Sequence, residues 1–171
     1  MKFIFLVMLL LCVSCTSNDN LEHWFSTLKS LDYKETDGLH GKIDDEFFYI
    51  KKLNNVELGI YLYRSKNKEE VDFVIAEISS EKNVDSNTLN QCLQVLIDDL
   101  DKVNKGLKKN FLEMISKKRK EEINGRVDLV SYEKFGNATL EYREIQTIKP
   151  GQFKFALQID YINEHDLGSK F

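Results

Sequence analysis

The spacing of apolar residues changes several times along the chain, and the first regular stretch has the period of a helix. Its apolar residues are Leu21, Trp24, Phe25, Leu28 and Leu31. Residues three and four positions apart share one face of a helix. Asn18, Asp19 and Asn20 precede this stretch, and such residues are favoured as N-caps. The pattern predicts a helix of about three turns that begins near residue 21.

From Phe47 the period changes to two, which predicts β-strands. In the clearest stretch Val56, Leu58, Ile60 and Leu62 alternate with Glu57, Gly59, Tyr61 and Tyr63. Asn54 and Asn55 separate this stretch from residues 47–53, and an asparagine pair favours a tight hairpin turn. Another strand is predicted at residues 71–78. Three sequential strands joined by short turns favour antiparallel pairing.

Residues 87–122 form the longest predicted element, and Asp85 and Ser86 precede it as N-caps. Its apolar face consists of Leu89, Leu93, Leu96, Leu100, Val103 and Leu107, continued by Phe111, Met114 and Ile115. An unbroken helix of this length would measure about 54 Å, which is longer than a domain of this size can cover. Gly106 destabilises a helix interior by about 1 kcal/mol. We therefore expect a bend or break between Asn104 and Asn110.

Three more strands are predicted at residues 126–132, 138–145 and 153–162, with turns at Gly136-Asn137 and Pro150-Gly151. The order of elements predicts an α+β fold for residues 21–171, taken as a single domain. We expect a mostly antiparallel sheet of about six strands. The N-terminal helix and the long, broken central helix would cover one face of this sheet.

The N-terminus has the layout of a secretory signal. Lys2 is followed by the uncharged apolar residues 3–13. A transmembrane helix needs about 17 to 25 apolar residues, so this run is too short to span a membrane. It ends in Cys12-Val13-Ser14-Cys15.

An aliphatic residue, a small residue and then a cysteine resemble the lipobox of bacterial lipoproteins. The resemblance implies that residues 1–14 are a signal peptide and that Cys15 becomes the first residue of the mature chain. Cys15 would carry acyl chains such as palmitate, and residues 15–20 would form the lipidated cysteine and a short tether. Several acyl chains hold a protein firmly, whereas a single chain holds it only marginally. The alternative is an ordinary secreted protein with an unrelated cysteine.

The resemblance also implies a location. The protein would be anchored in the bacterial cell envelope, with its globular domain in the periplasm or at the cell exterior. Thr16 stands where the inner-membrane lipoproteins of enteric bacteria carry an aspartate. We therefore expect the protein to be anchored in the outer membrane.

The charge of the chain bears on its binding partners, and the cysteine content bears on the state of Cys92. Loss of residues 1–14 leaves 23 basic residues against 28 acidic ones, a net charge of −5. This charge does not favour binding to nucleic acid. The one basic cluster, Lys117, Lys118, Arg119 and Lys120, is placed at the end of the long helix, where it complements the helix dipole. With Cys12 removed and Cys15 acylated, Cys92 is left alone on an apolar helix face, which predicts a buried thiol.

The sequence contains none of the common catalytic or metal-binding motifs. It lacks G-x-S-x-G, H-E-x-x-H, paired C-x-x-C, an EF-hand loop and clustered glycines. The histidines His23, His40 and His165 stand apart, and Asp98, Asp99 and Asp101 are predicted on a helix surface. Asp44-Asp45-Glu46 is predicted as a solvated turn, with a cation site or partner patch as the alternative. We therefore expect no catalytic residue, metal site or cofactor.

Tyr49, Tyr61 and Tyr63 are the candidate partner surface, because they are predicted to share one face of the sheet. Tyrosine suits an interface since it buries a large area and keeps a polar tip. The alternative is that a second layer, such as the first helix, covers them. The favoured function is a non-catalytic binding domain for a protein or glycan partner, attached to the membrane through Cys15. The alternatives are an immunity protein that neutralises a toxin acting in the periplasm, and an envelope enzyme.

Overall fold

Eight strands form one antiparallel sheet, and three helices complete the described part of the chain. The computed structural model describes residues 20–37, 45–64, 69–80, 84–123, 126–136, 138–145 and 153–161. The helices are α1 (Leu21–Ser30), α2 (Ser86–Val103) and α3 (Leu107–Ser116). The strands are β1 (Lys34–Thr36), β2 (Glu46–Leu53), β3 (Val56–Tyr63), β4 (Phe73–Ser80), β5 (Arg119–Ile123), β6 (Arg126–Phe135), β7 (Ala138–Ile145) and β8 (Phe153–Asp160). The predicted α+β class is confirmed, but the sheet has eight strands rather than about six.

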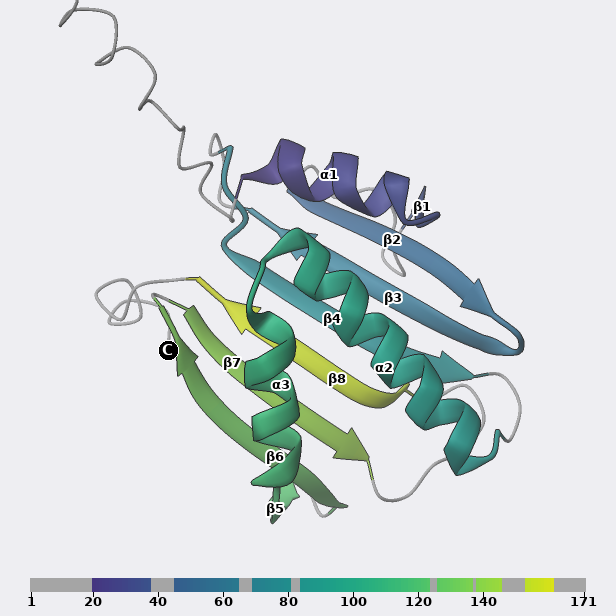
Figure 1. Ribbon diagram of the computed structural model, residues 1–171, viewed down its shortest axis with the longest axis vertical. Helices are drawn as coiled ribbons and strands as arrows, with labels where there is room; N and C mark the ends of the chain where they lie inside the picture. The colour runs from purple at the N-terminus through teal and green to yellow at the C-terminus, as the bar shows by residue number, and fades with distance from the viewer. Residues whose placement is uncertain are drawn as a thin grey trace, which may run out of the picture.

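The sheet consists of two meanders of four strands that meet in the middle. The strand order is β1-β2-β3-β4-β8-β7-β6-β5, and α2 and α3 connect β4 to β5 (Figure 1). Asn54 has a φ of 56°, as a two-residue hairpin turn between Leu53 and Val56 requires. Gly136 has a φ of 61° in the turn between β6 and β7. These two predicted turns therefore lie where the chain reverses, while Pro150-Gly151 lies outside the described residues.

The three helices lie on one face of the sheet (Figure 1). Helix α1 lies over β2, where the ring of Phe25 contacts the rings of Phe47 and Tyr49. Helix α2 packs on β3 and β4, and α3 packs on β6 and β7. No helix of the described residues covers the opposite face. The core lies between the sheet and the helices, and its largest side chains include Trp24, Tyr49, Tyr142, Phe111, Leu58 and Ile60.

The predicted break in the long helix lies at Asn104–Gly106. Gly106 has a φ of 103°, in the left-handed region that favours glycine. Asp101 reaches across the break, and its Oδ1 atom accepts hydrogen bonds from the backbone N–H groups of Gly106 (2.9 Å) and Lys108 (2.8 Å). The carboxylate of α2 therefore caps the free N–H groups at the start of α3.

The two strands that the sequence did not predict, β1 and β5, are the edges of the sheet. Helix α3 ends at Ser116, so the prediction of helix up to Glu122 is wrong. Residues 119–123 instead pair with β6, because backbone pairing at the sheet edge outweighs the helix propensity of lysine, arginine and glutamate. Both edge strands are short and charged, which discourages further strands from adding to the sheet.

Candidate functional site

The register of the β2–β3 hairpin separates the three candidate tyrosines. Tyr49 pairs with Ile60 on the helix-covered face, where its side chain is 0% exposed. Tyr61 pairs with Phe48, and Tyr63 pairs with Glu46 and Phe73, on the face without helices. The prediction that all three share one face is therefore wrong for Tyr49. Tyr49 follows Phe48 in the strand, and adjacent residues of a strand point to opposite faces. Phe48 lies opposite Tyr61 on the face without helices, so the ring of Tyr49 lies in the core.

Tyr61 and Tyr63 belong to a larger surface that we call the aromatic–acidic face. It lies on β2, β3 and β4 and comprises Glu46, Phe48, Ile50, Glu57, Tyr61, Tyr63, Phe73, Ile75 and Glu77. The rings of Phe48 and Tyr61 are stacked, with centroids 3.9 Å apart and an interplanar angle of 15°. Those of Tyr63 and Phe73 meet edge to face at 5.7 Å. All four aromatic side chains are half-buried.

Gly59 allows the Phe48 ring to lie close to the sheet surface. A Cβ atom at Gly59 would lie 3.0 Å from Cε2 of Phe48 and 3.3 Å from Cγ of Glu77. A methyl group here would press on both groups, whereas glycine leaves them room. The phenyl ring therefore covers the glycine, and Glu77 lies beside it.

The electrostatics of this face centre on Glu77. Burial raises the pKa of Glu77, the hydrogen bond from Tyr61 opposes this rise, and the charge of Glu57 adds to it. The hydroxyl of Tyr61 donates to Oε1 of Glu77 over 3.4 Å. Glu57 forms an ion pair with Lys52, whose Nζ atom lies 3.7 Å from Oε2 of Glu57. Among the side chains that the structure describes, no cation forms an ion pair with Glu77.

The same face of β5–β7 has a different character. Arg143 pairs with Glu141 at 2.7 Å, and Arg119 pairs with Glu121 at 2.8 Å. Tyr132, which is 47% exposed, lies beside the guanidinium group of Arg119 at 6.0 Å. These charges compensate one another. The sheet face that no described helix covers therefore has an aromatic–acidic part and a part with paired charges.

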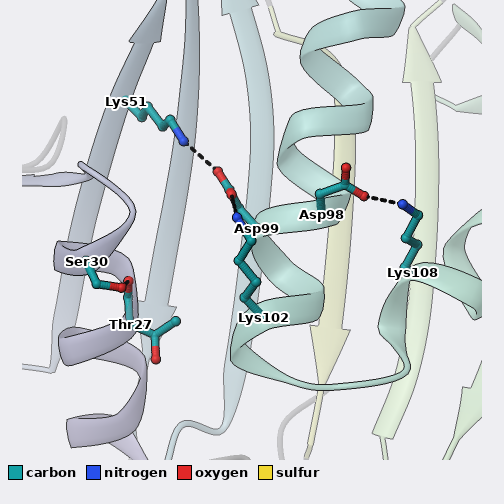
Figure 2. A network of polar contacts seen from close by, with 7 residues as sticks. All are labelled: Thr27, Ser30, Lys51, Asp98, Asp99, Lys102 and Lys108. Atoms are coloured by element: carbon teal, nitrogen blue, oxygen red, sulfur yellow. Dashed lines mark hydrogen bonds and ion pairs between the residues drawn. The ribbon is translucent and has the colours of Figure 1, made fainter.

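On the helix-covered side, a polar network joins the sheet to α2 (Figure 2). Asp99 accepts hydrogen bonds from Lys51 at 2.8 Å and Lys102 at 3.2 Å, and its side chain is only 3% exposed. The prediction that Asp99 lies on a helix surface is therefore wrong. Asp98 does lie on the outer side of α2, where it pairs with Lys108 at 2.7 Å.

Tyr33 is the aromatic neighbour of this network. The Lys51 ammonium lies 5.2 Å from the centroid of its ring. Burial and the charge of Asp99 raise the pKa of Tyr33, so its hydroxyl stays protonated. Asp98, Asp99 and Asp101 thus each contact a partner in the fold. Asp99 joins the sheet to α2, whereas Asp98 and Asp101 join α2 to the start of α3.

The remaining candidate residues fall into separate parts of the molecule. The Nε2 atom of His23 lies 2.9 Å from the carbonyl oxygen of Val103, which joins α1 to the end of α2. The predicted burial of Cys92 is confirmed, and burial raises the pKa of its thiol. The basic cluster is divided, because Lys117 and Lys118 follow α3 while Arg119 and Lys120 begin β5.

Several predictions fall outside the described residues. The signal peptide, the lipidation site Cys15, most of the tether, His40, Asp44 and His165 are among them. In the part of the chain that the structure describes, no group of three or more His, Cys, Asp or Glu side chains is arranged to hold a metal ion. No helix within the same ranges is long and apolar enough to cross a membrane.

Comparisons with known proteins were made at three levels. The chain matches no protein-family model, no curated protein and no solved structure.

Proposed function

We propose that the protein is a lipid-anchored binding protein of the bacterial cell envelope and that the aromatic–acidic face holds its partner. The observation that carries the proposal is the sheet face that no described helix covers, on which four half-buried aromatic side chains adjoin three acidic ones. Rigid aromatic side chains with polar tips are enriched at protein interfaces. The proposed activity is binding without catalysis, and the proposed partner is a protein.

The proposed anchor would keep this face near a membrane. Residues 16–20 between Cys15 and α1 can extend over at most about 17 Å. Helix α1 begins at Leu21, so the domain would be held close to the lipid surface. Thr16 favours the outer membrane, with the domain in the periplasm or at the cell exterior.

An immunity protein is the second candidate. The acidity of the aromatic–acidic face favours it, because a toxin with a cationic surface would be attracted to such a face. The two candidates predict different partners. An immunity protein would bind a toxin that enters the periplasm, whereas a binding or scaffold protein would bind a resident envelope protein.

The anchor is tested by replacing Cys15 with serine. We expect wild-type protein from membranes to begin at Cys15 and to carry acyl chains in its intact mass. The Cys15→Ser variant should accumulate as an uncleaved precursor. Detection of the same acylated mature form in the variant would rule the anchor out.

The binding face is tested by crosslinking in native envelopes. We expect one stoichiometric crosslinked partner with the wild type, and its loss in the double variant Tyr61→Ala/Tyr63→Ala. Tyr132→Ala is the matched control, since Tyr132 lies on the same side of the sheet among the paired charges. Equal crosslinking by the double variant and the wild type would exclude this face as the binding site. The identity of the partner separates the two candidates.

A further inference from the structure

We propose that the partner segment recognised by the aromatic–acidic face carries arginine or lysine side chains next to apolar ones. This inference rests on the proposed binding function and adds the chemistry of the partner. It follows from the charge of the face, from the room around Glu77 and from the arrangement of the rings.

Acidic residues outnumber basic ones on this face, and no cation among the described side chains pairs with Glu77. The strand positions of this face on β1 to β4 carry the acids Glu46, Glu57 and Glu77 and the cations Lys34 and Lys52, and Lys34 lies at the sheet edge opposite Ile50. Lys52 is exposed and pairs with Glu57 at 3.7 Å, so it is not the counter-ion of Glu77. On β5–β7, by contrast, Arg119 and Arg143 each have a carboxylate partner. A cationic partner would complement the aromatic–acidic part and gain little from the other.

Glu77 is placed where a long cationic side chain can approach it. Its cross-strand neighbours are Gly59 on β3 and Ala156 on β8. The Phe48 ring fills the space over Gly59, so the approach to Glu77 is from the β8 side, where Ala156 carries only a methyl group. The half-buried position strengthens an ion pair, because the local dielectric constant is lower than in water. An arginine or lysine of the partner can therefore pair with Glu77 over Ala156.

The rings beside Glu77 favour the same partner. Tyr61 donates to Glu77 and stacks on Phe48, so the carboxylate and two aromatic rings lie together. Cations are attracted to aromatic ring faces, and arginine also stacks on them. Ile50 and Ile75 lie on the same face and offer contacts to the apolar residues of the partner segment. Together these groups suit a cationic and apolar peptide segment.

Other occupants fit less well. A second copy of the chain bound face to face would bring the carboxylates of the two aromatic–acidic faces toward one another, and like charges repel. An anionic lipid surface would be repelled by the same carboxylates. The charge of this face thus favours a cationic protein segment.

The test uses the full acylated protein in detergent micelles and two synthetic peptides. One peptide alternates arginine with leucine, and the other alternates glutamate with leucine. Binding is measured by fluorescence anisotropy of labelled peptide. We expect the arginine–leucine peptide to bind and the glutamate–leucine peptide not to bind. Higher salt concentration should weaken the binding.

Two variants with the same change in net charge separate this site from general attraction. Glu77→Gln should weaken binding of the arginine–leucine peptide at least about tenfold, because it removes a half-buried charge partner. Glu141→Gln, on the part of the face with paired charges, should change it by less than about twofold. Cooperative thermal unfolding of both variants shows that the fold is intact.

Several results would overturn the inference. They are equal binding of the two peptides, equal loss of binding in both variants, or self-association of the wild type that Glu77→Gln abolishes. A resident partner that crosslinks at Tyr61 and Tyr63 while the arginine–leucine peptide fails to bind would also overturn it. In that case the proposed binding function stands and only the cationic character of the partner is wrong.

Discussion

Lys51 of β2 donates a hydrogen bond to Asp99 of α2 over 2.8 Å, and this ion pair joins the sheet to the helix layer. Lys51 lies on the helix-covered face of β2, opposite Leu58. Asp99 also accepts from Lys102 one helical turn further on. A buried carboxylate is tolerated only when its charge is compensated. The two lysines provide this compensation and fix the position of α2 over the sheet.

We predict that Asp99→Ala destabilises the protein by about 2–4 kcal/mol, because Lys51 is left partly buried without a counter-ion. The control is Asp98→Ala on the same helix, whose pair with Lys108 is half-exposed. Asp98→Ala should lower the free energy of unfolding by less than about 1 kcal/mol. Urea unfolding of the two variants measures the difference. Similar costs for both would contradict the structural role of Asp99.

Glu77 makes the stability of the protein depend on pH. Its pKa in the folded protein lies above the ordinary value of 4.5 because the carboxyl is half-buried. The folded state therefore holds the proton more tightly, and the contribution of Glu77 to stability falls as the pH rises through the folded pKa. We expect Glu77→Gln to be more stable than the wild type near pH 7. The difference should shrink as the pH falls toward 4.5. A difference in unfolding free energy that is constant over this range would contradict the assignment.

The start of α3 depends on Asp101 and Gly106. Asp101→Ala removes the acceptor of two backbone N–H groups and should cost about 1 kcal/mol. Gly106→Ala places a side chain at a positive φ and should cost about 1–2 kcal/mol. Amide hydrogen exchange at Lys108 should accelerate in both variants. The control Lys109→Ala, an exposed change on α3, should stay within about 0.5 kcal/mol of the wild type.

The number of reactive thiols per chain tests whether the signal peptide is removed and Cys15 is acylated. Cys92 is 3% exposed and burial raises the pKa of its thiol, so we expect it to react slowly with a thiol reagent in the folded protein. After unfolding, one reactive thiol per chain is expected, since Cys12 would be removed and Cys15 acylated. All three cysteines of the sequence would react in an unprocessed precursor. Two reactive thiols would indicate cleavage without acylation of Cys15.

Most strands and the helix break could be predicted because the sequence marks them locally. Val56, Leu58, Ile60 and Leu62 alternate along β3, and Gly106 interrupts an otherwise regular helical stripe. Strand β5 carries no such signal. Its residues are charged and favour a helix, and only their pairing with β6 makes them a strand.

The placement of Tyr49 was missed although a signal for it exists. Asn54-Asn55 as a two-residue turn places Leu53 opposite Val56, and counting back places Tyr49 opposite Ile60 in the core. Asp99 is a similar case. It lies three residues after Leu96 and four before Val103, within the apolar stripe of α2. Its partner Lys51 is 48 residues away in sequence, so local spacing cannot identify the compensating charge.

The role of Phe48, Gly59 and Glu77 could not be predicted from the pattern alone. Strand periodicity places each residue on a face, but it does not show which faces the helices cover. That depends on long-range packing of the helices against both meanders. The aromatic–acidic face therefore became recognisable only from the arrangement of the layers.

The most direct test of the account is hydroxyl-radical footprinting of the protein in intact envelopes and after purification. The account predicts that Tyr61 and Tyr63 are protected in the envelope by the bound partner and become labelled after purification. Tyr132 should be labelled in both preparations, and Tyr49 in neither. Equal labelling of Tyr61 and Tyr63 in the two preparations, or protection confined to Tyr132, would contradict the aromatic–acidic face as the partner-binding surface.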